Sequence, residues 1–303
     1  MTTKLEPNPQ LIGGVAKPPF AVTPDPQAEF TRRADRFDWL SRTGNLGSYL
    51  QFMAGIARAQ ATVAGALTAP APLPEQRIEL CRASRMPPLD RDVIARSDLM
   101  AKAVSLMIAA LAELDMPEAA RQALEALGQA GPEDRAWLID NVMARAIPPD
   151  SIGPHMFAAA AVQVVMALHA QTLDAARLVP VQVGICPSCG GVPASSRVTE
   201  RLGAEGVRYA FCATCATEWN EVRVKCLCCG STKGISYRSV EDENATVKAE
   251  VCTECNSWVK ILYHNKNPSL DPIADDVASL GLDLLMRDTG FRHGGFDPFI
   301  QGL

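Results

Sequence analysis

Residues 186–189 read CPSC and residues 212–215 read CATC, and the same spacing returns forty residues later as CLCC at 226–229 and CTEC at 252–255. Each half is a Cys-x2-Cys-x22-Cys-x2-Cys segment, and ten residues separate the two halves. Nine of the ten cysteines in this 303-residue chain lie in this window. A repeat that stays in register at four points predicts two copies of one small structural unit.

The paired cysteines have the spacing of metal-binding loops. Two thiolates three residues apart, followed by a tight turn, direct both sulfurs toward one point, and two such turns complete a tetrahedral cage of four sulfurs. Gly190 and Gly230 each follow the second cysteine of a pair, where such a turn needs a permissive backbone. We predict two metal sites, the first formed by Cys186, Cys189, Cys212 and Cys215 and the second by Cys226, Cys229, Cys252 and Cys255.

Two cysteines lie outside this scheme. Cys228 corresponds to Ser188 in the first copy, so we predict a spectator thiol, with a reactive neighbour of the second site as the alternative. Cys81 is far from the window and is predicted to pack as a small apolar side chain.

Disulfides and thiol redox catalysis are the alternatives to metal binding. The first 26 residues are rich in proline and lack the apolar core of about 7 to 15 residues that a signal peptide contains, so we expect a cytoplasmic chain with reduced thiols. Redox catalysis of the thioredoxin kind needs one exposed Cys-x2-Cys pair rather than four pairs in register. Four sulfurs suit zinc and a single iron alike, and the short strands predicted between the pairs favour a mononuclear site over an iron–sulfur cluster.

The residues before the cysteine window predict an all-α domain. The segment SDLMAKAVSLMIAALAELD, residues 97–115, carries its apolar side chains on one broad helix face. The segment FAAAAVQVVMALHA, residues 157–170, is apolar almost all round, which predicts a central helix that is too short to span a bilayer. We predict helices near residues 27–43, 47–68, 90–115, 117–129, 132–146 and 154–173, with loops at 70–74 and 86–88.

The cysteine window itself predicts short strands, since EVRVKC, ATVKAEVC and WVKILYH alternate or are rich in β-branched residues. Each copy of the repeat is too small to bury an adequate core, so a bound metal would hold it together. An amphipathic helix is expected near residues 270–289. The predicted fold class is α+β and multidomain, with an irregular segment at 1–26, an all-α domain at 27–178, zinc-ribbon modules at 184–223 and 224–266, and a C-terminal helix and tail at 267–303 packing on the rest.

Charge disfavours nucleic-acid binding, the commonest function of zinc ribbons. Residues 186–266 contain ten Lys or Arg and nine Asp or Glu. Eight thiolates with two divalent ions would bring this region to a charge of about −3, whereas a phosphate-binding surface is basic.

Motifs of catalysis are also missing from the sequence. It contains no glycine-rich phosphate loop after a strand, no HExxH and no GxSxG, so we predict no catalytic residues and no small-molecule substrate. The acidic residues Asp275, Asp276 and Asp283 are predicted to solvate the terminal helix. The four histidines are predicted to be ordinary packed or surface residues: His155, His169, His264 and His293.

Three stretches resemble the formate dehydrogenase accessory protein family, FdhE: CPSCG, RYAFCATCATEWNEVRVKCLCCG and DDVASLGLDLLMRDTGFRHGGFDPF. The resemblance covers most of the chain and is strongest from Gly184 to Phe299. The joined CATCATEW and RVKC sequences are specific, because a generic ribbon does not contain them. The CLCC pair departs from the family pattern by its additional cysteine.

The resemblance implies a cytoplasmic, non-enzymatic maturation factor, or chaperone, that binds the catalytic subunit of formate dehydrogenase. It also implies rubredoxin-like sites that hold iron, with zinc as the alternative. We expect the helical domain and the ribbon faces to contact the immature enzyme together, and no membrane insertion. A rubredoxin-like one-electron carrier and a structural zinc-ribbon protein that binds nucleic acid are the alternative functions.

Overall fold

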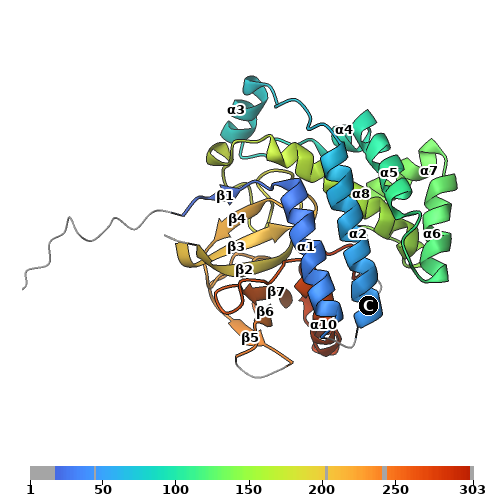
Figure 1. Cartoon of the computed structure of the whole chain (residues 1–303). Coiled ribbons are helices and arrows are strands. Elements are labelled where there is room, and N and C mark those ends of the chain that lie inside the picture. Colours follow the sequence, from blue (N-terminus) through green and yellow to red (C-terminus); the bar gives the residue numbers. More distant parts are fainter. Residues whose placement is uncertain (1–17, 44–45, 202–203, 241–243, 301–303) are drawn as a thin grey trace, which may run out of the picture.

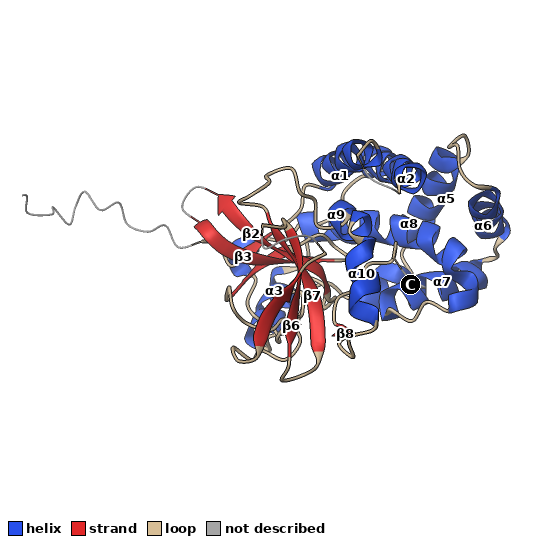
Figure 2. Ribbon diagram, turned by 90° about the horizontal axis from the view of Figure 1, so that it is seen from below, coloured by secondary structure: helices blue, strands red, loops and turns tan. Residues whose placement is uncertain are grey.

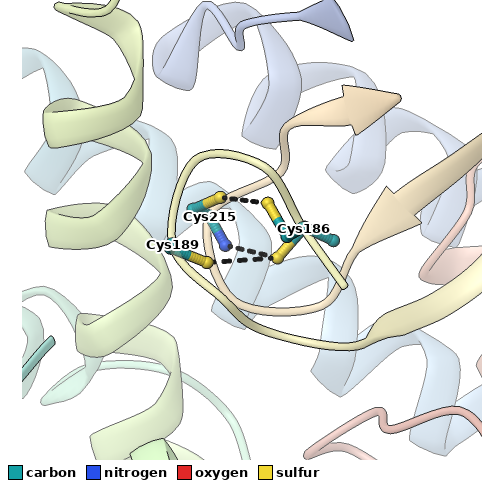
Figure 3. A group of neighbouring side chains, drawn as sticks. Cys186, Cys189 and Cys215 are labelled. Carbon is teal, nitrogen blue, oxygen red and sulfur yellow. Dashed lines mark hydrogen bonds between the residues drawn. The ribbon is translucent and has the colours of Figure 1, made fainter. Parts of the chain in front are cut away.

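Helices and one mixed sheet form two sides of the molecule in the computed structural model, which describes residues 18–43, 46–201, 204–240 and 244–300. Figure 2 shows the sheet on one side and the larger group of helices on the other, with α9 and α10 between them. The helical side comprises α1 (Pro26–Ser41), α2 (Gly47–Ala66), α4 (Arg91–Ala95), α5 (Asp98–Leu111), α6 (Glu118–Gln129), α7 (Pro132–Ala144) and α8 (Ile152–Gln171). Helix α3 (Glu75–Ala83) overlaps the sheet in the view of Figure 2, and 3-10 turns lie at Pro149–Ser151 and Ala175–Arg177. The predicted α+β fold class is confirmed.

The observed helices differ from the predicted ones in several places. The helix predicted at 90–115 is two helices, because Ser97 adopts an extended conformation and its hydroxyl accepts the N–H of Met100 at the start of α5. The helix predicted at 270–289 is also divided, into α9 (Ala274–Ala278) and α10 (Leu280–Arg287), with the break at Ser279. The short helix α3 was missed, since its sequence carries only one buried residue, Cys81.

The core of the helical side is α8. Phe157 and the four alanines that follow it are completely buried against α2, α5, α6 and α7. The helical stretch Pro149–Gln171 has 23 residues and contains an 18-residue window with a mean hydropathy of 1.5, so by length and composition alone it could cross a membrane, and the prediction that it is too short was wrong. In this fold, however, 78% of its apolar window is buried inside the protein, as expected for a core helix.

Both copies of the repeat contribute to one continuous sheet. Its strands are β1 (Ala21–Val22), β2 (Pro193–Arg201), β3 (Ala204–Cys212), β4 (Glu218–Glu221), β5 (Ile235–Arg238), β6 (Val247–Cys252), β7 (Ser257–Tyr263) and β8 (Arg292–His293). They are ordered β1-β4-β3-β2-β7-β6-β5 (Figure 1), and β8 pairs with β7. Each copy is therefore a three-stranded antiparallel unit, and the two units join where β2 runs parallel to β7.

Segments at both ends of the chain hold the sheet against the helices. The strand β1, which lies in the segment predicted to be irregular, covers the edge of β4, and residues 1–17 of that segment lie outside the described residues. Arg36 on α1 forms two hydrogen bonds, of 2.7 and 2.9 Å, with the carboxylate of Asp275 on α9. Helix α10 packs Leu282 and Met286 against Ala249 and Val251 of β6.

Candidate metal centres

The first Cys-x2-Cys loop of each copy folds in the same way. Gly190 and Gly230 donate their N–H groups to the carbonyls of Cys186 and Cys226, both at 3.0 Å. The φ angles of these glycines are 73° and 78°, a region that residues with a Cβ rarely occupy. The predicted tight turn is therefore present after both pairs.

The second Cys-x2-Cys loop of each copy uses a different residue in the same conformation. Ala216 follows Cys215 with a φ of 57°, and Asn256 follows Cys255 with a φ of 51°. Asparagine tolerates this left-handed conformation better than alanine does. The forty-residue repeat of the sequence is thus also a repeat of backbone conformation.

Each set of four cysteines brings its sulfurs together. The Sγ atoms of Cys186 and Cys215 lie 3.6 Å apart, as do those of Cys189 and Cys212 (Figure 3). In the second set the corresponding distances are 3.7 Å from Cys226 to Cys255 and 3.8 Å from Cys229 to Cys252. Within each set all four sulfurs lie within 4.8 Å of one another.

These distances match a tetrahedral metal site. A metal–sulfur bond of about 2.3 Å implies sulfur–sulfur edges of about 3.8 Å in a regular tetrahedron. Backbone N–H groups also point at the sulfurs: Gly191 at Cys189 (3.4 Å), Thr214 at Cys212 (3.4 Å) and Cys228 at Cys226 (3.3 Å). Such donors favour the thiolate form that a metal ligand requires. Both sets could therefore hold a metal ion.

The first set is almost completely buried. The exposed fractions of Cys186, Cys212 and Cys215 are 0%, and that of Cys189 is 2%. Burial raises the pKa of Cys186 and Cys215 well above the usual value. Burial also acts to raise the pKa of Cys212, but the neighbouring S–H donors outweigh it and the net pKa is well below the usual value. Four thiolates in this environment therefore need the charge of a metal ion to balance them.

The second set lies at the surface. Cys229 is exposed and Cys255 is half-buried, whereas Cys226 and Cys252 are buried. The pKa of Cys226 rises to about 12, because its S–H donates to Cys228 and because it is buried. The two candidate centres therefore share their geometry but differ in access to solvent.

Cys228 lies beside the second set and outside it. In the first copy its counterpart Ser188 accepts a hydrogen bond of 2.9 Å from Thr217, whose hydroxyl also contacts the sulfur of Cys215 at 3.3 Å. Cys228 is exposed, and it approaches Gly294 of the C-terminal tail so closely that a Cβ at residue 294 would have no room. The sequence predicted that Cys228 lies outside the four ligands, but nothing in it indicated that the C-terminal tail approaches this residue.

The histidines and Cys81 that the sequence singled out, and two tryptophans close to the cysteine pairs, are structural. Trp219 and Trp258 are buried, with exposed fractions of 2% and 4%, and the ring of Trp258 lies 4.5 Å from that of His293. His155 donates from Nδ1 to the carbonyl of Ser151 at 2.7 Å, and burial lowers its pKa. Cys81 is buried, as predicted.

The prediction that the acidic cluster solvates the terminal helix was wrong. Asp275 and Asp276 are 4% and 0% exposed, and Asp276 pairs with the fully buried Lys260. Asp283 also pairs with Lys260. The sequence could not reveal this network, since its basic members stand on other elements.

Family models cover almost all of the chain that the structure describes. Residues 18–183 match the model described as FdhE, N-terminal, residues 185–223 match the FdhE central domain, and residues 224–300 match the FdhE C-terminal domain. This chain belongs to the FdhE family. The resemblance found in the sequence is thereby confirmed.

Relatives and a solved structure agree with this assignment. The FdhE homolog of Rhizobium meliloti is 52% identical over 300 residues, which cover 98% of each chain. The FdhE protein of Escherichia coli is 35% identical over 276 residues, covering 89% of this chain and 87% of the relative. The crystal structure of the FdhE protein from Pseudomonas aeruginosa superposes with a TM-score of 0.83 at 28% identity, covering 94% of this chain and 99% of that one.

Proposed function

We propose that this FdhE family member is a cytoplasmic accessory protein that binds the catalytic subunit of formate dehydrogenase and supports its activation, and that it is not itself an enzyme. Membership of the family across the helical side, the sheet and both cysteine sets carries this proposal. The predicted domains are proposed to act together as one unit that binds the subunit. They span residues 27–178, 184–223, 224–266 and 267–303.

The surface of the fold supports a protein-binding role. Trp39 on α1 is 52% exposed, and Leu284 and Leu285 on α10 are each 48% exposed. Tryptophan in particular is enriched among the residues that anchor protein interfaces. We expect the immature subunit to contact both the helical side and the sheet.

The two cysteine sets are proposed to hold one metal ion each, iron as the family resemblance implies or zinc in its place. The ligands would be Cys186, Cys189, Cys212 and Cys215 for one ion and Cys226, Cys229, Cys252 and Cys255 for the other. Iron in four thiolates supplies one-electron chemistry, whereas zinc supplies structural stability alone.

A one-electron carrier is the second candidate function, and the exposure of the second set favours it. Cys229 is exposed and Cys255 half-buried, so an electron donor or acceptor could approach this centre closely. The iron-loaded protein should then be red, bleach on reduction and reoxidise rapidly. A colourless, zinc-loaded protein purified from iron-replete cells would contradict this version.

Deletion of the gene tests the accessory function. Formate dehydrogenase activity should disappear while the catalytic polypeptide is still made, and the intact gene should restore the activity. The Cys186→Ser plus Cys226→Ser variant should fail to restore it. The matched control is Cys228→Ser, which removes a cysteine of the same segment outside both sets. Unchanged formate dehydrogenase activity in the deletion strain would refute the proposal.

A further inference from the structure

The repeat leaves one strand edge of the sheet unfilled. In the first copy, the outer edge of β2 is filled by β7, which runs parallel to it and pairs Ser195 with Lys260. In the second copy β5 occupies the place of β2, since Ser195 pairs with Phe211 and Ser236 pairs with Val251, forty-one and forty residues later. Among the strands that the structure describes, none pairs with the outer edge of β5.

The main chain of β5 is oriented for pairing on that side. Thr253 donates its N–H to the carbonyl of Gly234 at 3.0 Å, so the main-chain groups of Gly234 face β6. These groups alternate in direction along an antiparallel strand. Those of Ser236 therefore also face β6, whereas the N–H and C=O groups of Ile235 and Tyr237 face away from it.

The side chains along this edge are accessible and chemically mixed. Tyr237 is 38% exposed and Val240, just beyond the strand, is 64% exposed. The exposed Arg238 lies with its guanidinium 5.0 Å from the ring centroid of Phe291, and in the described part of the chain it forms no ion pair. An added strand would fit with an apolar side chain near Tyr237.

We propose that the outer edge of β5 binds an extended segment of a partner protein, which adds to the sheet as a parallel strand in the way that β7 adds to β2. The identity of the partner as the catalytic subunit rests on the proposed function. Ile235 pairs directly with Cys252, so the added strand lies one strand away from a cysteine of the second set.

A second copy of this chain is a less suitable occupant of the edge. The strand that would have to pair with β5 is β4, the counterpart of β7 in the first copy. Its outer edge is already covered by β1, which pairs Ala21 with Trp219, and Asn220 donates its N–H to the carbonyl of Phe20 at 2.7 Å. The β4 strand of one copy could therefore pair with β5 of another only if β1 first separated from β4.

A peptide of residues 256–266, NSWVKILYHNK, tests the edge without formate dehydrogenase, because it contains the strand that fills the equivalent edge. Binding of the labelled peptide to the full chain should be saturable and should slow hydrogen exchange at the amides of Ile235 and Tyr237. Tyr237→Pro removes the outward N–H and leaves the ladder with β6, so affinity should fall by roughly ten-fold.

The matched control is Tyr237→Val, which keeps the N–H group and should bind the peptide within about three-fold of the wild type. Unchanged metal content and an unchanged circular dichroism spectrum will show that each variant is folded. The hydrogen-exchange measurement tests the edge on the wild-type chain itself, so it does not depend on the folding of any variant. Absence of saturable binding, or equal binding by Tyr237→Pro, would overturn the proposed edge.

Binding of the purified, unmatured catalytic subunit tests the partner separately. The subunit should slow exchange at the same two amides, compete with the peptide, and bind Tyr237→Pro at least roughly ten-fold more weakly than the wild type. If the subunit binds both proteins equally, the accessory function stands and its assignment to this edge is wrong. If the subunit binds neither the wild type nor Tyr237→Pro, the accessory function fails. The peptide measurements then decide alone whether the outer edge of β5 is a binding site.

Discussion

The ammonium nitrogen of Lys260 lies 2.9 Å from Oδ1 of Asp276, and neither side chain is exposed to solvent. Lys260 also donates to the backbone carbonyl of Asp276 at 2.7 Å and pairs with Asp283. Burial acts to lower the pKa of Lys260, but the two carboxylates outweigh it and the net pKa is raised. A charged lysine on β7 thus ties α9 and α10 to the sheet.

Replacing this lysine should destabilise the fold strongly. Lys260→Met leaves the buried carboxylate of Asp276 without its cation, and the free energy of unfolding should fall by about 3–5 kcal/mol. Lys102→Met, at an exposed position of α5, should change it by less than about 0.5 kcal/mol. Urea unfolding followed by circular dichroism measures both. Equal stability of the two variants would show that the buried pair is not needed.

Asp283 should make stability depend on pH. The ordinary pKa of this carboxyl group is 3.8, and burial in the folded chain raises the pKa to about 6. The negative charge of Asp276 adds to this rise, whereas the positive charge of Lys260 opposes it. The folded chain therefore binds more protons between these values than the unfolded chain, and this group lowers the free energy of unfolding as pH rises from about 4 to about 6.

Asp283→Asn should remove this contribution. The difference in unfolding free energy between wild type and variant should change across that pH range and stay constant above about pH 7. Asp288→Asn, at an exposed position just after α10, is the control for the loss of one carboxylate from this part of the chain. A flat difference for Asp283→Asn would place the pKa of Asp283 near its ordinary value.

The two metal centres should differ in exchange rate. The second set contains the exposed Cys229, whereas the first set is buried, so a chelator should remove metal in two phases that differ by on the order of ten-fold or more. Cys229→Ser should abolish the fast phase and Cys189→Ser the slow one. Metal release followed by absorbance checks this, and a single phase in the wild type would contradict the difference in access.

Cys228 should be dispensable for metal binding. Cys228→Ser is expected to retain two metal ions per chain, since serine holds the corresponding position in the first copy. Cys229→Ser should retain one. Iodoacetamide should modify one thiol of the loaded wild type and none of Cys228→Ser, because the other exposed sulfur is held as a ligand. Loss of a metal ion in Cys228→Ser would make this residue a ligand.

Local features of the fold were predictable from the sequence because they depend on residues close together in it. The Cys-x2-Cys spacing with Gly190 or Gly230 determines the turn, and the alternation in ATVKAEVC determines β6. The helix starts at Pro26 and Pro132 also follow local rules.

Features that join distant segments were not predictable. The ion pair of Arg36 with Asp275 connects positions 239 residues apart, so neither side chain could be recognised as buried from its neighbours. The parallel pairing of β2 with β7 likewise depends on the packing of two copies rather than on either copy. One local feature was also missed, the division of α9 from α10 at Ser279, whose hydroxyl donates to the carbonyls of Asp275 and Asp276 in competition with a continuous helix.

The parallel junction of the sheet determines when the molecule can be completed during synthesis. Ser195 of β2 pairs with Lys260 of β7, the last strand of the second copy. The first copy therefore leaves the ribosome with the outer edge of β2 unpaired, and this edge stays unpaired until β7 has been synthesised. Pairings between distant residues form slowly. All four cysteines of the first set are therefore synthesised before the sheet can close, and a nascent chain halted before β7 would expose the very edge that the finished protein hides.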